Sequence, residues 1–384
     1  MERASRKTWA LRVLGVGLGL LALCLVVIRL SYGGGDPYPD GTQDPVLGAS
    51  EVIQIGELPF PAGNVTASPE GRVFVNIHPF VQADRFTDAF LFELVDGTPV
   101  PYPDAATQPA LRHVFGMTVG PRNRLWLTSP ATLDRERTRL IAIDLASGRI
   151  VVDHRFDEGV ARFAQDLRVT PDGRTMLLAD TGAFRFTAAS LLVVDLDTMG
   201  VHSLLSGHPS TQPQDWMIRT PEGEHTIAGG LITFSVGVDG IALSPDGTEL
   251  YFAAMSHDTL FRIPMEAVLD ANLTAAQHAA RLTAVASKPL SDGIETTTSG
   301  EVLVTDIEHG AIVGIQPDGT RRTLVRLGDR IGWADGVTVG PGGRVYFTDS
   351  QIPRYLDPWL QPPDREVLDT SAPHTAVYSF VLPN

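Results

Sequence analysis

The chain has 384 residues, 43% of them hydrophobic, and its 30 basic and 45 acidic side chains give a formal net charge of −15. This composition excludes an intrinsically disordered chain and a protein with many membrane spans, and the acidic balance argues against nucleic acid as a partner. The 37 glycines and 28 prolines are spread along the chain and indicate many turns between short strands.

The first 30 residues predict a signal anchor or a signal peptide. An apolar run from Val13 to Ile28 follows four basic residues, Arg3, Arg6, Lys7 and Arg12. As a helix this run is about 24 Å long, so it needs its flanking residues to cross a hydrocarbon core of about 30 Å. The alternative is cleavage at the weak small-x-small site Ser31-Tyr32-Gly33. Both alternatives leave the basic flank inside and place the rest outside the cytoplasm, in the periplasm or at the cell surface, anchored or secreted.

The remaining chain divides into a linker and one domain. Residues 31–50 are rich in Gly, Pro and Asp and predict a flexible linker. Residues 51–384 then form the folded domain. The only cysteine, Cys24, lies in the N-terminal apolar run, so the domain has neither a disulfide nor a thiolate zinc site.

One strand–turn–strand pattern recurs through the domain: a short strand, a turn of the P-x-G type, and a second strand of alternating apolar residues. The six copies start at Asn64, Met117, Leu167, Ile241, Ile294 and Val337. Strand-like runs between them bring each unit to three or four antiparallel strands. The pattern therefore predicts an all-β fold, a six-bladed β-propeller. We expect Val52–Ile55 and Val377–Leu382 to complete one shared blade, and Pro264–Ala280 to be a helical insertion.

The register of the repeat places one residue of each blade at the mouth of the central channel. Counting eight residues back from the turn glycine, or its equivalent, gives Gly63, Phe115, Gln165, Asp239, Asp292 and Asp335. Clustered carboxylates repel one another unless a cation or raised pKa values relieve them. We therefore expect the three aspartates to bind Ca²⁺, another divalent cation or an organic cation. The alternative is that each Asp-Gly pair is ordinary turn chemistry at a loop-to-strand junction.

Other side chains are expected around the same mouth. Aromatic faces for a cationic ligand come from Phe115, Trp216, Phe234 and Trp333, and polar groups come from Gln165 and Asp166. Residues 201–235 form the longest connection between copies, which predicts either a lid over the mouth or a surface decoration. His257 and His309 follow the second strands of units four and five, as bases at the channel rim or as surface residues.

Over roughly residues 52–350 the sequence resembles the yellow/major royal jelly protein family. The segments that carry the resemblance include GRVFVNIHPF from Gly71, LLADTGAFRFTAASLLVVDLD from Leu177, and GVDGIALSPDGTELYFAAMSHDTLFRIPMEAVL from Gly237. The resemblance implies a secreted six-bladed propeller, and for some members a small aromatic amine bound in the central channel. Because the cysteines of the insect members are missing, a bacterial-type exported relative is expected.

The sequence resembles the gluconolactonase/senescence-marker propellers more distantly. That resemblance implies divalent-metal ligands at Asp239 and Asp292, but Gly63 and Phe115 stand where that group has two further ligands. The function we expect is an exported, monomeric propeller that binds a small molecule, a divalent cation or both in its channel. The alternatives are a metal-dependent lactonase or ester hydrolase, in which a metal-bound water attacks the substrate, and a scaffold for protein partners.

Overall fold

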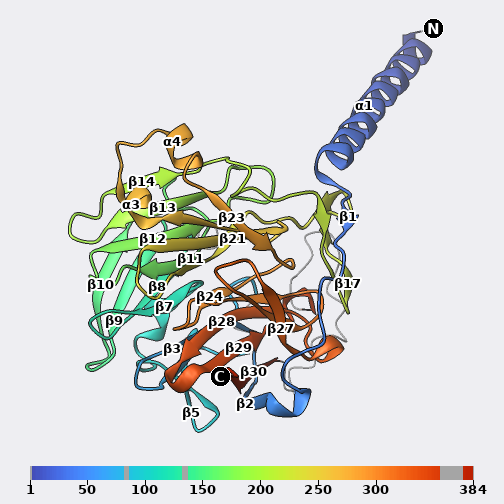
Figure 1. Cartoon of the computed structure of the whole chain (residues 1–384). Helices are drawn as coiled ribbons and strands as arrows, with labels where there is room; N and C mark the ends of the chain where they lie inside the picture. The colour runs from blue at the N-terminus through green and yellow to red at the C-terminus, as the bar shows by residue number, and fades with distance from the viewer. Residues whose placement is uncertain (1, 82–85, 132–136, 355–374, 384) are drawn as a thin grey trace.

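The computed structural model describes residues 2–81, 86–131, 137–354 and 375–383 (Figure 1). In this part of the chain six four-stranded antiparallel sheets follow one another. The first three are β3 (Ala62–Ala67), β4 (Val73–Ile77), β5 (Leu91–Val95), β6 (Thr98–Pro101); β7 (Met117–Gly120), β8 (Arg124–Ser129), β9 (Arg139–Asp144), β10 (Arg149–Arg155); and β11 (Ala164–Val169), β12 (Thr175–Asp180), β13 (Ser190–Asp195), β14 (Val201–Leu204). The last three are β20 (Val238–Leu243), β21 (Glu249–Ala254), β22 (Thr259–Pro264), β23 (Thr283–Ser287); β24 (Ile294–Thr296), β25 (Val302–Asp306), β26 (Ala311–Ile315), β27 (Arg321–Arg326); and β28 (Ala334–Gly340), β29 (Arg344–Asp349), β30 (Thr375–Val381), β2 (Ile53–Leu58).

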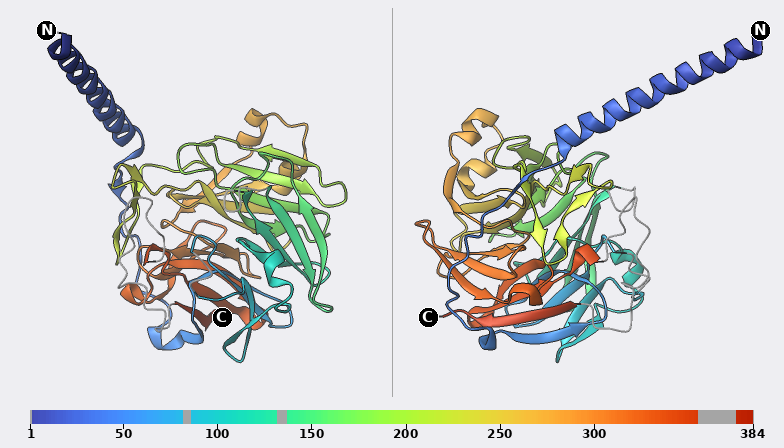
Figure 2. Two further views of the ribbon diagram at one scale, coloured as in Figure 1. Left: turned by 180° about the vertical axis from the view of Figure 1, so that it is seen from behind. Right: turned by 90° about the vertical axis from the view of Figure 1, so that its right-hand side faces the viewer.

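The first strands of the sheets surround one axis. In order β3, β7, β11, β20, β24 and β28 each contact the next, and β28 contacts β3. The six sheets fan out from this ring as blades (Figures 1 and 2). Apolar side chains fill the space between neighbouring blades, as where Leu177 of β12 and Phe252 of β21 share one buried cluster. The predicted six-bladed β-propeller is confirmed.

The ring closes by pairing the two ends of the domain. Strand β2 is the outermost strand of the sixth blade and pairs antiparallel with β30, with Ile53 opposite Ser379 and Leu58 opposite Thr375. The expected shared blade is therefore present. The expected helical insertion is present as two short helices, α3 (Met265–Leu269) and α4 (Ala275–Ala279).

In four of the six blades a glycine follows the mouth residue and allows the inner strands to approach one another. A Cβ on Gly293 would lie 2.7 Å from the backbone oxygen of Asp335 in the next blade, and one on Gly116 would lie 1.9 Å from that of Gln165. None of Gly240, Gly293 and Gly336 has a positive φ. The Asp-Gly pairs are therefore not left-handed turns, and their glycines are required by close packing around the axis.

Two further parts lie outside the blades. The N-terminal helix α1 (Glu2–Tyr32) projects away from the propeller (Figure 2). The connection between β14 and β20 contains short strands, β15 (Trp216–Met217), β16 (Arg219–Thr220), β17 (Gly223–Glu224), β18 (Thr226–Ile227) and β19 (Ile232–Thr233). We call residues 206–237 the lid.

Residues 34–47, which we call the strap, are bound to the propeller and not free as the linker prediction expected. Strand β1 (Asp36–Pro37) pairs with β15 of the lid. The Tyr38 hydroxyl donates to the backbone oxygen of Lys288 at 2.7 Å, and the backbone N–H groups of Val46 and Leu47 donate to β27 at 2.9 Å each. Composition alone indicates irregular structure here, but it does not indicate whether the segment has bonding partners.

Candidate functional site

The structure brings the three predicted aspartates together at the mouth. Asp239 and Asp335 lie in the inner strands β20 and β28, and Asp292 lies two residues before β24. Asp239 and Asp335 are buried, and Asp292 is partly exposed. Burial and the nearby charge of Asp292 raise the pKa of both Asp239 and Asp335 well above the usual range. Burial raises the pKa of Asp292 to about 6. The mouth is therefore a place where negative charge is costly.

Each carboxyl group has a different neighbour. Gln165 lies against Asp239, and the amide orientation that satisfies its hydrogen bonds places the nitrogen 2.8 Å from both carboxyl oxygens. The indole Nε1 of Trp333 donates to Oδ2 of Asp292 at 2.7 Å. Oδ2 of Asp335 has no hydrogen-bond partner among the described residues, and Nε2 of His78 lies 3.8 Å from it. This oxygen is thus a buried acceptor whose hydrogen bond is not made within the described part of the protein.

His78 is neutral at the mouth. Burial lowers its pKa to about 3, so its contact with Asp335 is not an ion pair at neutral pH. Its Nδ1 accepts the backbone N–H of Phe80 at 3.2 Å, which leaves the proton on Nε2, facing Asp335. The ring therefore offers a polar N–H to the mouth without neutralising the carboxylates.

Asp166 is held in the interior of the channel. Its Oδ1 accepts the side chain of Arg168 at 2.6 Å, and its Oδ2 accepts the backbone N–H of Ile241 in the next blade at 3.0 Å. Arg168 also donates to the backbone oxygen of Ile294 at 2.9 Å and lies 3.5 Å from Glu295. This network links the third, fourth and fifth blades below the mouth. Asp166 still acts on the site, since its charge contributes to the raised pKa of Asp239.

The predicted aromatic residues form separate groups. Trp333 is buried and meets Phe234 of the lid, with ring centroids 6.1 Å apart. Phe115 lies on another side of the mouth, 5.5 Å from the ring of His78. Trp216 packs edge-on against Tyr38 of the strap at 4.9 Å. The structure therefore places Trp333, Phe234 and Phe115 near the carboxylates, and uses Trp216 to join strap to lid.

The lid covers the mouth. Of the two alternatives for the long connection, a lid or a surface decoration, the structure has the lid. A buried apolar cluster joins Ile218 and Val236 of the lid to residues from the loops of the fourth, fifth and sixth blades: Met255, Leu290, Ile307, Trp333 and Ile352. Tyr38, Trp216 and Phe234 pack against the same cluster. The lid is thus fixed on the propeller by hydrophobic contacts, with Phe234 and Trp333 above Asp292.

Sequence reasoning missed three charged or titratable residues of this region: His78, Arg168 and Lys288. Lys288 is fully buried, and its Nζ donates to the backbone oxygen of Pro289 at 3.0 Å and to Oγ of Ser291 at 2.9 Å. Burial lowers its pKa to about 7, and its charge partly offsets the raised pKa of Asp239. Arg168 could have been found, because it lies two residues after Asp166 and so faces the same side of the strand.

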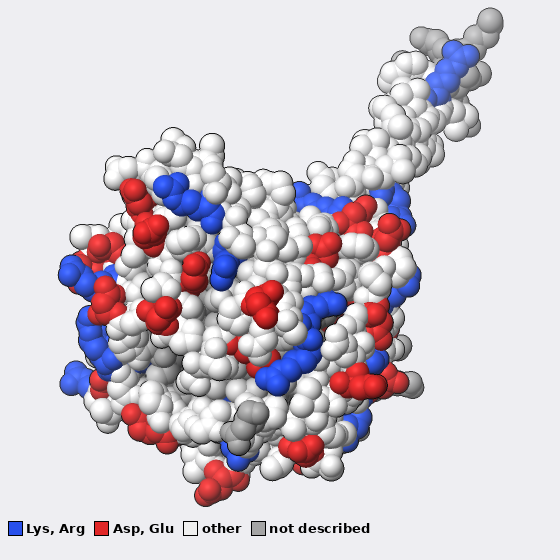
Figure 3. All heavy atoms as spheres, viewed as in Figure 1, with Lys and Arg blue, Asp and Glu red and all other residues white. Residues whose placement is uncertain are grey.

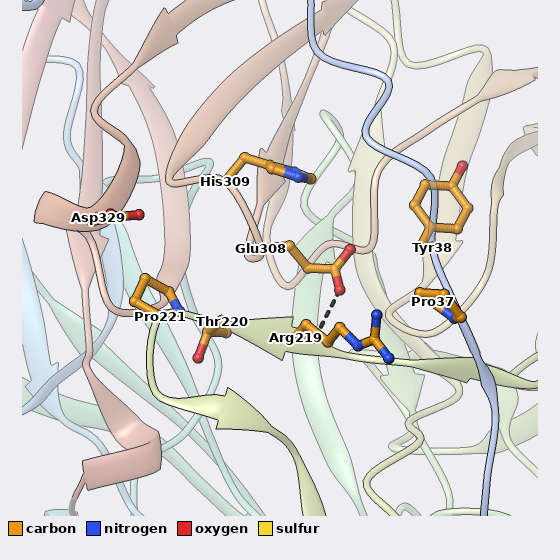
Figure 4. Close-up of a pocket in the computed structure, with 8 residues that line it drawn as sticks. All are labelled: Pro37, Tyr38, Arg219, Thr220, Pro221, Glu308, His309 and Asp329. Carbon is orange, nitrogen blue, oxygen red and sulfur yellow. Dashed lines mark hydrogen bonds between the residues drawn. The ribbon is translucent and has the colours of Figure 1, made fainter.

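A hollow of about 320 Å³ lies where strap, lid and fifth blade meet (Figure 4). Its lining residues are Pro37, Tyr38, Arg219, Thr220, Pro221, Glu308, His309 and Asp329. Oε1 of Glu308 accepts the backbone N–H of Arg219 at 2.7 Å, and burial raises the pKa of Glu308 to about 7. His309 is half-buried here and bonds to Asp306, whereas His257 is buried and accepts the backbone N–H of Thr259. None of the nine predicted site residues lines this hollow.

The mouth does not provide a ready set of metal ligands. Among the described residues, no group of three or more His, Cys, Asp or Glu side chains is placed to hold one metal ion. Asp239 and Asp292 are engaged by Gln165 and Trp333, and Asp335 faces His78. The donor set implied by the gluconolactonase resemblance is therefore not assembled here, and we derive no chemistry through a metal.

The comparison that decides the family covers most of the propeller. Residues 114–338 match the family model for the major royal jelly protein. This chain belongs to the major royal jelly protein family. The match confirms the resemblance seen in the sequence, and all nine predicted site residues lie inside the matched range. No curated protein matches the chain in sequence.

Solved structures agree with the fold of this major royal jelly family member. It is similar to a gluconolactonase from Xanthomonas campestris, with 14% identity, a TM-score of 0.54, and coverage of 92% of this chain and 98% of that one. A putative gluconolactonase is similar at 13% identity, with a TM-score of 0.50 and coverage of 91% and 96%. At such identities the likeness shows a shared propeller fold and nothing about activity.

Proposed function

We propose that this protein is an extracytoplasmic propeller that binds a small organic cation, such as an aromatic amine, at its channel mouth. The observation that carries the proposal is the convergence of Asp239, Asp292 and Asp335 from three successive blades, with raised pKa values. A bound positive charge would stabilise the ionised form of all three carboxyl groups at once, and this electrostatic gain favours cation binding.

The surroundings favour an organic cation over a bare metal ion. A metal needs several oxygen or nitrogen ligands at about 2.0–2.6 Å, and such a set is not arranged among the described side chains. An ammonium group needs only hydrogen-bond acceptors, and Oδ2 of Asp335 is a buried acceptor without a hydrogen-bond partner among the described residues. The rings of Trp333 and Phe115 offer an apolar wall for the rest of such a molecule. Divalent cations remain the second ligand class to be tested.

Export is the second part of the proposal. Residues Leu11–Tyr32 form a helical segment whose most apolar 18-residue stretch has mean hydropathy 2.6, long and apolar enough to cross a membrane. The basic residues before it favour an orientation with the N-terminus inside. A phosphatase reporter fused after Asn384 should be active outside the cytoplasm, and activity of a cytosol-dependent reporter alone would contradict export.

The binding proposal is tested with a matched pair of small molecules. 2-Phenylethylamine and 2-phenylethanol share their ring and chain, but only the amine is charged at pH 7.5. We expect the amine to raise the midpoint of thermal unfolding and to give a calorimetric binding signal, because a ligand of the native state stabilises it. Equal effects of the two molecules, or none, would contradict a cation site. Ca²⁺ is titrated in parallel.

Variants locate the binding to the mouth. Replacing both Asp292→Asn and Asp335→Asn should lower amine affinity at least tenfold, since charge-assisted bonds contribute about 1.5–3 kcal/mol each. The control is Asp246→Asn, in the turn at the other end of β20, where the carboxylate is exposed and bonds within its own turn. Unchanged affinity in the double variant would move the site elsewhere.

Metal-dependent lactone hydrolysis is less well supported. Gly63 has no side chain, and Phe115 packs against His78 and Phe80 at the position where the gluconolactonase group has a ligand. A lactonase assay with added divalent metals, on the intact chain and on Asp292→Asn, gives the test. Lactone turnover that depends on both the metal and Asp292 would favour the hydrolase over the amine-binding protein.

A further inference from the structure

An aromatic contact joins the N-terminal helix to the propeller. The rings of Tyr32, the last residue of α1, and Phe186, in the loop between β12 and β13, have centroids 4.7 Å apart. Phe186 is 47% exposed despite this contact. Phe184 lies 6.3 Å from Phe186 and 5.5 Å from Phe234 of the lid. The aromatic edge, defined as Phe184 and Phe186, therefore continues from the helix end to the lid.

The length of α1 fixes where Tyr32 would lie in a membrane. The apolar segment Leu11–Tyr32 has 22 residues, which is about 33 Å of helix, close to a hydrocarbon core of about 30 Å. Apart from the contact of Tyr32, its apolar stretch is not buried against the propeller, and Figure 3 shows it almost free of charged groups between its two ends. With the segment spanning the bilayer, Tyr32 falls at the membrane–water interface, where tyrosine is enriched.

The chain after Tyr32 is too short and too firmly held to let the propeller move away. The hydroxyl of Thr233 in β19 donates to the backbone oxygen of Gly34, and the backbone N–H of Asp36 donates to the backbone oxygen of Asp215 at 3.0 Å. Only Gly33 separates Tyr32 from the first of these bonds. A Cβ on Gly33 would lie 2.5 Å from the backbone oxygen of Leu231, so even this residue is packed against the lid.

We propose that the aromatic edge is a membrane-docking surface whose partner is the interfacial region of the bilayer that α1 spans. Phe186 must lie at nearly the depth of Tyr32, because their rings are in contact and the chain between helix and lid has no slack. A half-exposed phenylalanine gains free energy when its ring leaves water for this region. The docking holds the lid beside the membrane surface. It depends on an uncleaved α1 and not on amine binding.

The test measures the depth of single cysteines in the full chain, reconstituted in phosphatidylcholine nanodiscs. Because Cys24 is the only native cysteine, Cys24→Ser gives a cysteine-free background. Phe186→Cys and Val151→Cys are each labelled with bimane. Val151 is the matched control, since it is 45% exposed but lies in β10, the outermost strand of the second blade. Phe184→Cys is a second probe of the edge should Phe186→Cys fail to fold.

We expect nitroxide lipids labelled near the headgroup to quench most of the bimane fluorescence at position 186 and little of it at position 151. Aqueous iodide should show the opposite order. Equal iodide quenching at the two positions would overturn the docking surface, as would loss of Cys24 from the mature native protein by intact mass. Binding of 2-phenylethylamine is measured on the same nanodiscs, so failure of docking and failure of the binding site give separate results.

Discussion

The indole Nε1 of Trp333 donates a 2.7 Å hydrogen bond to Oδ2 of Asp292, and this bond joins the residue before β28 to the charge at the channel mouth. Burial raises the pKa of Asp292 to about 6, and the bond from Trp333 acts in the opposite direction by stabilising the ionised form. On its other side Trp333 meets Phe234 of the lid. Protonation of Asp292 is therefore linked to the packing of the lid.

Trp333→Phe should raise the pKa of Asp292 further above about 6. The variant removes the bond that favours the carboxylate and keeps most of the burial, so a rise of about one unit is expected for a bond of about 1 kcal/mol. Carbon-detected NMR of the aspartate carboxyl signals against pH measures it. Trp126→Phe, at a buried tryptophan in the core between blades, is the control. If the pKa of Asp292 were unchanged in Trp333→Phe, the hydrogen bond from Trp333 would not control its titration.

Asp239→Asn should stabilise the domain at pH 8 and leave its stability unchanged near pH 4. The folded-state pKa of Asp239 is above its usual value of 3.8, so the folded form binds the proton more tightly than the unfolded form. The stability contribution of this group is therefore full below the unfolded pKa and is lost as pH rises toward the folded pKa. Asparagine cannot ionise and avoids that loss, with an expected gain of about 1–2 kcal/mol at pH 8.

Urea unfolding at the two pH values measures this difference. Asp246→Asn is again the control, because hydrogen bonds to Ser244 and Thr248 lower the pKa of Asp246 to about 2 and keep it ionised at both pH values. If Asp239→Asn were instead less stable than the native protein at pH 8, the ionised Asp239 would be stabilised there by a positive charge other than those named above.

Gly293→Ala should destabilise the propeller by about 2–4 kcal/mol, because its Cβ would lie 2.7 Å from the backbone oxygen of Asp335 and 3.0 Å from the backbone nitrogen of Val337. The two strands cannot separate without disturbing the ring. Gly41→Ala, whose Cβ would meet nothing closer than 3.6 Å, serves as control for the change from glycine. Equal unfolding midpoints for the two variants would contradict the close packing around the axis.

The strap should hold less firmly above about pH 7. His309 bonds to Asp306 at 3.0 Å and lies 3.6 Å from Asp40 of the strap. The bond to Asp306 raises the pKa of His309, so its contribution to stability is full below its usual pKa of 6.5 and is lost as pH rises through the folded value. Burial raises the pKa of Glu308 to about 7. Its contribution to stability therefore also falls as pH rises, between its usual pKa of 4.5 and about 7.

Hydrogen exchange of the strap amides, corrected for intrinsic rates, should therefore show weaker protection at pH 8.5 than at pH 6. His309→Gln should reduce that difference severalfold, while the amides of β20 stay protected throughout. If the strap were equally protected at both pH values, His309 would have no part in holding it.

The sequence predicts the blades well because their signals are local. Alternating apolar residues and P-x-G turns specify each strand pair within about 14 residues, and one shared register is enough to align Asp239, Asp292 and Asp335. The contacts of these residues could not be predicted in the same way. His78 reaches Asp335 from the position after β4, and Lys288 is buried in the loop between β23 and β24, so the surroundings of both depend on distant parts of the chain.

The Asp-Gly pairs illustrate the same limit. The sequence pattern is equally compatible with a turn and with a close approach of two strands, since glycine serves both. The choice depends on what faces Gly293 across the axis, which is the backbone of Asp335, and no local pattern reports that neighbour.

The pairing of β2 with β30 has a consequence for how the protein is made. Ile53 follows shortly after α1, whereas its partner Ser379 lies in β30 and is synthesised only after the first five blades and two strands of the sixth. Until then β2 is an unpaired edge strand, open to wrong partners on other chains. The strap, which lies between α1 and β2 and pairs with the lid, can hold this unpaired strand near the propeller until β30 is synthesised. Ring closure would then be the last step of maturation, and chains interrupted before Thr375 should accumulate as protease-sensitive intermediates.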